Sequence, residues 1–104
     1  MTRSQEIAST IIAQLGGRRF SAMTGAKNFI ALENGVQFDI GRGATNKATK
    51  VRVTLTDADL YDLAFFQWKP RALECVPVAG AASGIYAEDL ARLFTEATGF
   101  DTRL

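Results

Sequence analysis

The hydrophobic positions of this chain repeat with a helical period at both ends and with a period of two in between. An apolar stripe of isoleucine and leucine predicts a helix over residues 4–15, and a second stripe that includes Tyr86 predicts a helix over residues 86–98. Each segment is followed by glycine, which adopts the left-handed conformation that ends helices at little cost. The helices are therefore expected to flank the middle of the chain.

The middle of the chain alternates apolar and polar residues, which is typical of strands buried on one face. Asn34-Gly35 separates the strand-like runs 28–33 and 36–40, and this dipeptide favours a two-residue type I′ hairpin turn. In that register Ala31 lies opposite Phe38. Further strands are predicted at 50–56, 61–68 and 73–78, and a short edge strand at 18–24.

Three remaining segments are predicted to connect the helices and strands. Residues 41–49 are polar and contain two glycines, so a mobile loop is expected there, and residues 79–84 are expected to form a flexible link. Residues 57–62 leave two alternatives open, a helical turn or the start of a strand. The fold class that follows is α+β: a single domain over residues 1–104, with a four- or five-stranded antiparallel meander and both helices packed on one face.

The amino-acid composition excludes several kinds of catalytic and metal site. The 104 residues include one cysteine and no histidine, which excludes Ser-His-Asp triads, Cys-His pairs, histidine metal sites and cysteine-based zinc clusters. Asp57, Asp59 and Asp62 lie close in sequence but lack the spacing of a calcium loop, so a solvated turn is favoured over a metal site. Cys75 is expected to be a buried, inert thiol. We expect a protein that is not an enzyme and needs no cofactor or metal.

The sequence shows neither the pattern of a signal peptide nor an apolar run near the ~18 residues that cross a bilayer. A cytoplasmic protein that does not engage membranes is therefore expected. Its charge is uneven: residues 1–52 carry eight basic and three acidic groups, and residues 53–104 carry four basic and eight acidic groups. Either the two halves pair with each other in the fold, or one face is basic and meets an anionic partner.

The strand predictions also bring a set of side chains to the sheet face that faces away from the helices. On that face the cations of the third strand lie beside two aromatic residues of the fourth. The set comprises Ile30, Leu32, Gln37, Asp39, Lys50, Arg52, Phe66 and Trp68.

Three interpretations of this face stay open. Arg52, Phe66 and Trp68 are residue types that anchor protein interfaces, so the face suits a partner protein or a second copy of the chain. Alternatively, Trp68 stacks on a base of single-stranded DNA or RNA while cations of the loop and third strand meet phosphates; these cations are Arg42, Lys47, Lys50 and Arg52. In the third interpretation, Phe66 and Trp68 lie in the core, under a helix or loop. Asp39 and Asp62 would repel phosphate, which favours the protein interface.

Several segments resemble small proteins encoded by phages, prophages and mobile elements. They are residues 14–29 (QLGGRRFSAMTGAKNF), 51–55 (VRVTL), 59–62 (DLYD) and the stretch from Gly84 to Gly99. The resemblance spans most of the chain and implies a bacteriophage or mobile-element origin, with no catalytic residues to carry over. We therefore expect an accessory protein that binds a host or phage protein, for example to inhibit a host defence or nucleic-acid machine.

Overall fold

The computed structural model describes residues 3–100 and contains one antiparallel sheet with the strand order β1-β2-β3-β4-β5. The strands are β1 (Lys27–Leu32), β2 (Gly35–Asp39), β3 (Lys50–Leu55), β4 (Tyr61–Lys69) and β5 (Glu74–Ile85). The helices are α1 (Arg3–Leu15), α2 (Gly17–Thr24), the 3₁₀ turn η1 (Ala87–Asp89) and α3 (Leu90–Thr98). Among the charges counted above, Asp101 and Arg103 lie outside the described residues.

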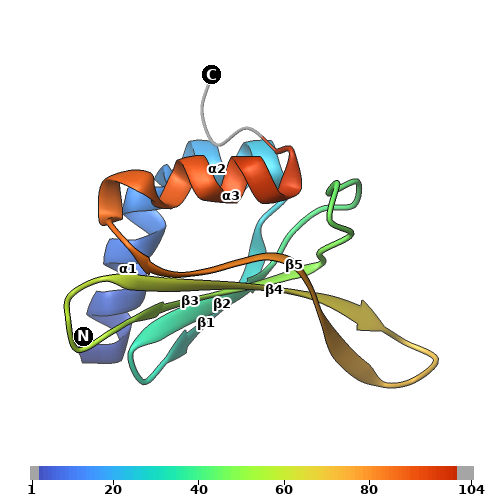
Figure 1. The fold of residues 1–104 in the computed structure, drawn as a ribbon, viewed down its shortest axis with the longest axis horizontal. Coiled ribbons are helices and arrows are strands. Elements are labelled where there is room, and N and C mark those ends of the chain that lie inside the picture. The colour runs from blue at the N-terminus through green and yellow to red at the C-terminus, as the bar shows by residue number, and fades with distance from the viewer. Residues whose placement is uncertain (1–2, 101–104) are drawn as a thin grey trace.

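All three α-helices lie on the same side of the sheet (Figure 1). The core between the two layers contains an aromatic cluster, in which the Phe20 ring lies 5.4 Å from that of Phe38 and 5.1 Å from that of Phe94, measured between centroids. Val51 and Val53 of β3 are fully buried beneath the helices. The predicted α+β meander with terminal helices on one face is therefore confirmed, with five strands and one additional helix.

The additional helix corrects the edge strand that was predicted over residues 18–24. These residues form α2, in which Phe20 and Thr24 are buried one turn apart while Ala22 is exposed. The Thr24 hydroxyl donates a hydrogen bond to the Phe20 carbonyl at 2.7 Å. A segment this short fits both periods, and the contacts of Phe20 with the core favour the helix.

The β1–β2 hairpin forms as expected, but its turn is Glu33-Asn34, and neither Asn34 nor Gly35 has a positive φ. The type I′ prediction is therefore wrong. Gly35 is instead required in β2, where an added Cβ would lie 2.1 Å from the Val53 carbonyl oxygen. Ala31 consequently pairs with Val36, two positions from the predicted partner. A shift of two leaves every side chain on its expected face.

Strand β5 runs through residues 79–84, which were expected to form a flexible link. At Gly80 an added Cβ would lie 2.6 Å from the Ala97 side chain and 3.1 Å from the Phe65 ring. The small residues therefore let α3 pack closely on β5 and do not mark a loop. The open alternative at 57–62 resolves into a turn that ends at Leu60, with β4 beginning at Tyr61.

The predicted helix over residues 86–98 is shorter than expected. Tyr86 is extended and 61% exposed, so its place on the apolar helix face was wrong. The helix proper begins at Leu90 after the 3₁₀ turn and ends at Gly99 in the left-handed conformation, as predicted.

Candidate functional site

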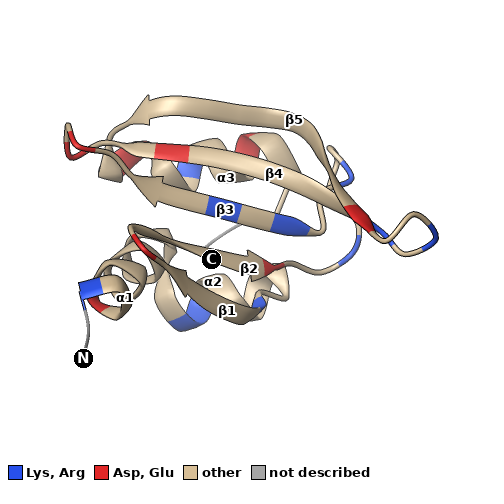
Figure 2. Cartoon of the chain, turned by 90° about the horizontal axis from the view of Figure 1, so that it is seen from below, with Lys and Arg blue, Asp and Glu red and all other residues tan. Residues whose placement is uncertain are grey.

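The sheet face opposite the helices, called the outer face below, is the surface seen in Figure 2, and the helices lie behind it. The strand register places Gln37 beside Arg52, Asp39 beside Lys50, and Lys50 beside Phe66. Trp68 pairs with Cys75 on β5. The prediction that the cations of β3 share a face with Phe66 and Trp68 is therefore confirmed, and no described helix or loop covers them.

At the centre of the outer face, Arg52 is held in one orientation by two neighbours. Its guanidinium carbon lies 5.0 Å above the centre of the Phe66 ring, within the range of a cation–π contact. Its Nε and Nη2 atoms donate to the Gln37 side-chain oxygen at 3.2 and 3.0 Å. Phe66 is half-buried under this arrangement, while Trp68 and Ile30 are 40% and 55% exposed.

Charge is sorted along the strands and not between the two halves of the sequence. A meander brings alternate turns to the same end of the sheet, so the start of β1, the β2–β3 loop and the β4–β5 turn meet at one end (Figure 2). Among residues 3–100, that end, called the basic end below, gathers six cations and two acids: Lys27, Arg42, Lys47, Lys50, Lys69 and Arg71, with Asp39 and Glu74. The turns at the opposite end carry only acids: Glu33, Asp57, Asp59 and, at the start of β4, Asp62.

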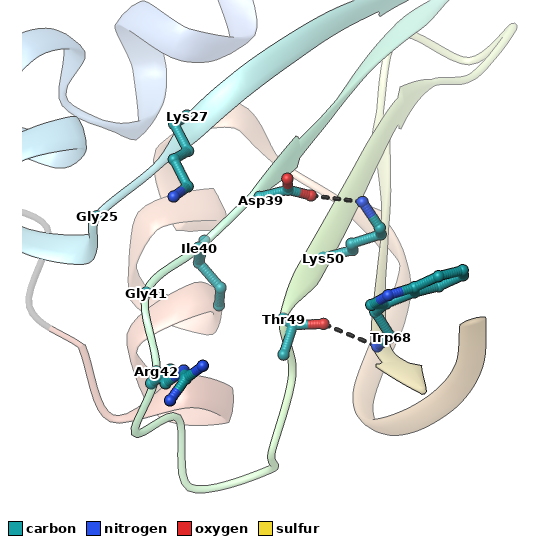
Figure 3. A pocket seen from close by; sticks show the side chains of 9 residues that line it. All are labelled: Gly25, Lys27, Asp39, Ile40, Gly41, Arg42, Thr49, Lys50 and Trp68. Atoms are coloured by element: carbon teal, nitrogen blue, oxygen red, sulfur yellow. Dashed lines mark hydrogen bonds and ion pairs between the residues drawn. The ribbon is translucent and has the colours of Figure 1, made fainter. Parts of the chain in front are cut away.

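A pocket of about 680 Å³ opens at the basic end of the outer face. Figure 3 shows Lys27 and Arg42 on one side of it and Trp68 at the opposite rim, with Asp39 and Lys50 between them. Gly25, Ile40, Gly41 and Thr49 complete the lining. Three of the nine lining residues are cationic and one is acidic, so the pocket carries a positive charge.

Lys27 reaches this pocket because β1 contains a bulge. Asn28 has a φ of 56°, and the pairing of β1 with β2 shifts between Lys27 and Ile30. The extra residue turns Lys27 onto the outer face opposite Asp39, whereas regular alternation from Ile30 would point it toward the helices. Sequence analysis missed Lys27 for this reason, and the only signal was an asparagine, a residue that tolerates positive φ.

Asp39 is compensated within the site. Its carboxylate accepts hydrogen bonds from Lys50 Nζ at 2.6 Å and from Asn28 Nδ2 at 2.8 Å. Partial burial alone would raise the pKa of Asp39, but these hydrogen bonds and the charges of Lys50 and Lys27 outweigh it and hold the pKa below its ordinary value. Asp62 lies at the acidic end. The repulsion of phosphate expected from these two residues is therefore weak at the basic end.

The β2–β3 loop, expected to be mobile, is anchored to the fold on several sides. Gly41 N donates to the Thr24 carbonyl and Thr45 N to the Thr98 carbonyl, each at 2.8 Å. The Asn46 side chain donates to the Ala79 carbonyl at 2.6 Å. Two alanines of the loop, Ala44 and Ala48, are buried. Carbonyls at the ends of two helices thus fix the loop. Because these partners lie far from the loop in the sequence, its composition alone suggested mobility.

The structure brings together three of the five proposed nucleic-acid contacts, namely Arg42, Lys50 and Trp68, in the pocket. Lys47 is exposed on the loop outside the pocket lining, and Arg52 lies further along β3. Cys75 is exposed, so the expectation of a buried thiol was wrong; its position opposite Trp68 places it on the outer face.

Within residues 3–100, no group of three or more cysteine or carboxylate side chains is arranged to hold a metal ion. None of the helices in that range is both long and apolar enough to cross a membrane.

Comparison with known proteins leaves the family open: no family model, no curated protein and no solved structure matches this chain. The resemblance to small phage and mobile-element proteins therefore stays a prediction.

Proposed function

We propose that this chain is a non-enzymatic accessory protein of a phage or mobile element that docks a host or phage protein on its outer face, in the cytoplasm of the host cell. The observation that carries the proposal is the arrangement at the centre of that face. Arg52 lies over Phe66 and is hydrogen-bonded to Gln37, with exposed Trp68 and Ile30 on either side. Inhibition of a host defence or nucleic-acid machine is the concrete form of this function.

This arrangement has the properties of an interface anchor. Arginine and tryptophan dominate the binding energy of protein interfaces, most of all where they are held in place before binding. Arg52 loses little side-chain freedom on docking because two neighbours already orient it. The separation of charge along the sheet supports one docking orientation, in which the acidic side of the partner lies over the basic end.

The test compares substitutions on opposite faces. Arg52→Ala and Trp68→Ala change the outer face. Arg18→Ala removes the same charge as Arg52→Ala, but from an exposed position of α2 on the helix side. We expect a protein captured from bacterial host lysate by the wild type and by Arg18→Ala, but not by the two outer-face variants. The captured protein, once purified, should protect β3 and β4 from hydrogen exchange. Capture that is insensitive to Arg52 and Trp68 would refute the proposal.

A second candidate, single-stranded DNA or RNA binding, is favoured by the basic end. Lys27 and Arg42 form no ion pair with a described carboxylate, and Trp68 offers a ring on which a base can stack. With about four phosphate contacts, the logarithm of the affinity should fall against log[salt] with a slope of roughly −3. An oligonucleotide that fails to bind at low salt would eliminate this candidate and leave the protein interface standing.

A further inference from the structure

The pocket at the basic end combines two kinds of wall. Lys27 and Arg42 lie on one side, and Trp68 lies on the other (Figure 3). Lys50, the third cation, is engaged by Asp39 at 2.6 Å. Two cations are therefore available to an incoming anion, and an aromatic ring lies across the pocket from them.

We propose that this pocket binds a nucleoside phosphate, with the phosphate between Lys27 and Arg42 and the base against the Trp68 ring. Lysine and arginine both donate charge-assisted hydrogen bonds to phosphate oxygens, and a base of any identity gains stacking energy on an indole. A volume of about 680 Å³ lies within the range of pockets that enclose small ligands. A bare anion would use only the cationic side and leave the aromatic rim without a role.

The backbone segments that carry the walls of the pocket are held to one another by hydrogen bonds. Trp68 N donates to the Thr49 hydroxyl at 2.8 Å, which ties the aromatic rim to the end of the β2–β3 loop. The start of that loop is tied to the end of α2 by the hydrogen bond from Gly41 N to Thr24. Gly25 has a φ of 71°, and an added Cβ there would lie 3.1 Å from Gly41, so the two glycines allow the backbones to meet. A preformed site loses less conformational entropy on binding.

This inference shares the chemistry of the second candidate function, cations for phosphate and an aromatic ring for a base, and names the unit that is recognised. The same chemistry has two sources, a free nucleotide or one nucleotide of a single strand. The arms of the test below separate these sources.

Trp68 is the only tryptophan in the chain, so its fluorescence reports on the pocket directly. The probes are AMP, adenosine, inorganic phosphate and a single-stranded oligodeoxyadenylate. We expect AMP to quench Trp68 to saturation, and to bind at least tenfold more tightly than adenosine or inorganic phosphate. Lys27→Gln and Arg42→Gln should each weaken AMP binding by about five- to tenfold, because each removes one charge-assisted contact.

Arg71→Gln is the matched control, since it removes an exposed arginine from the same end of the sheet outside the pocket lining. It should leave AMP affinity within twofold of the wild type. Thermal melts of all three variants establish that they fold. An equal loss of affinity in Arg71→Gln and Arg42→Gln would show nonspecific charge attraction and overturn the inference.

The remaining outcomes test the pocket and the second candidate function separately. Equal affinity for AMP and inorganic phosphate overturns the base contact, and no response to AMP overturns the site. If the oligonucleotide binds while AMP neither binds nor competes, the inference fails and the second candidate function stands. If AMP binds and the oligonucleotide does not, the pocket is a site for free nucleotides and the second candidate fails.

Discussion

Replacing Asp39 by asparagine tests the electrostatic account of the pocket. The carboxylate accepts hydrogen bonds from Lys50 and Asn28, which hold it between β1 and β3. Asparagine can still accept from Lys50, and the Asn28 amide can turn so that its oxygen accepts from the new amide group. The substitution therefore removes the charge attraction and the charge-assisted character of both hydrogen bonds while preserving the size of the side chain.

The expected loss of stability is modest because the pair is partly solvated. The side chains of Lys50 and Asp39 are 26% and 25% exposed, so water screens much of their attraction. Exposed ion pairs contribute about 0.2–1 kcal/mol, and a hydrogen bond to a charged group adds to this, so we expect a loss of about 1 kcal/mol. In a domain of this size the melting temperature should fall by about 4–8 °C.

The stability difference between wild type and Asp39→Asn should depend on pH in a defined direction. The pKa of Asp39 is lower in the folded protein than in the unfolded chain, so the folded state favours the carboxylate. Its stabilisation is complete well above the ordinary aspartate pKa of about 3.9, and it is lost as the pH falls through that value toward the lower pKa of the folded state. The difference between wild type and Asp39→Asn should therefore be largest at pH 7 and shrink in acid.

Thermal melts followed by circular dichroism between pH 7 and pH 3 measure this difference. Asp57→Asn, in the exposed turn before β4, is the matched control and should change the melting temperature by less than about 2 °C at every pH. A difference for Asp39→Asn that stays constant or grows in acid would refute the ion pair as the cause.

Three further predictions follow from the fold and the outer face. Phe20→Ala should cost about 3–5 kcal/mol in denaturant unfolding because the ring is fully buried against two others; a loss below about 1 kcal/mol would contradict that packing. Gly35→Ala should cost roughly 1–3 kcal/mol because its Cβ meets strand β3, more than Gly17→Ala, where only a positive φ is strained; equal losses would contradict the close approach. In the folded protein Cys75 should react with a maleimide at a rate close to that in denaturant, and strong protection would contradict an uncovered outer face.

Local alternation was sufficient to predict the outer face. Strand β3 alternates cleanly, so Arg52 and Lys50 could be assigned to one side from sequence, and the same period in β4 added Phe66 and Trp68. The error of two positions in the β1–β2 register did no harm, because the side-chain period is also two. These features depend only on neighbouring residues and on the pleat of the sheet.

The pocket depends on contacts between distant parts of the chain and was therefore missed as a unit. Lys27 enters it through a bulge at Asn28, which regular alternation does not contain. The β2–β3 loop is held by the Thr24 and Thr98 carbonyls, whose positions follow from how α2 and α3 pack. The error over α2 arose for the same reason, since only the core contacts of Phe20 distinguish its two periods.

Quenching of Trp68 fluorescence by iodide and by caesium tests most directly the claim that the outer face ends in an exposed, positively charged site. The iodide-to-caesium quenching ratio of this single tryptophan at low salt should exceed that of free N-acetyltryptophanamide, because anions concentrate near Lys27, Arg42 and Lys50. This excess should shrink in Arg42→Gln and disappear at high ionic strength. A ratio equal to or below that of N-acetyltryptophanamide, or protection from both ions, would contradict the claim.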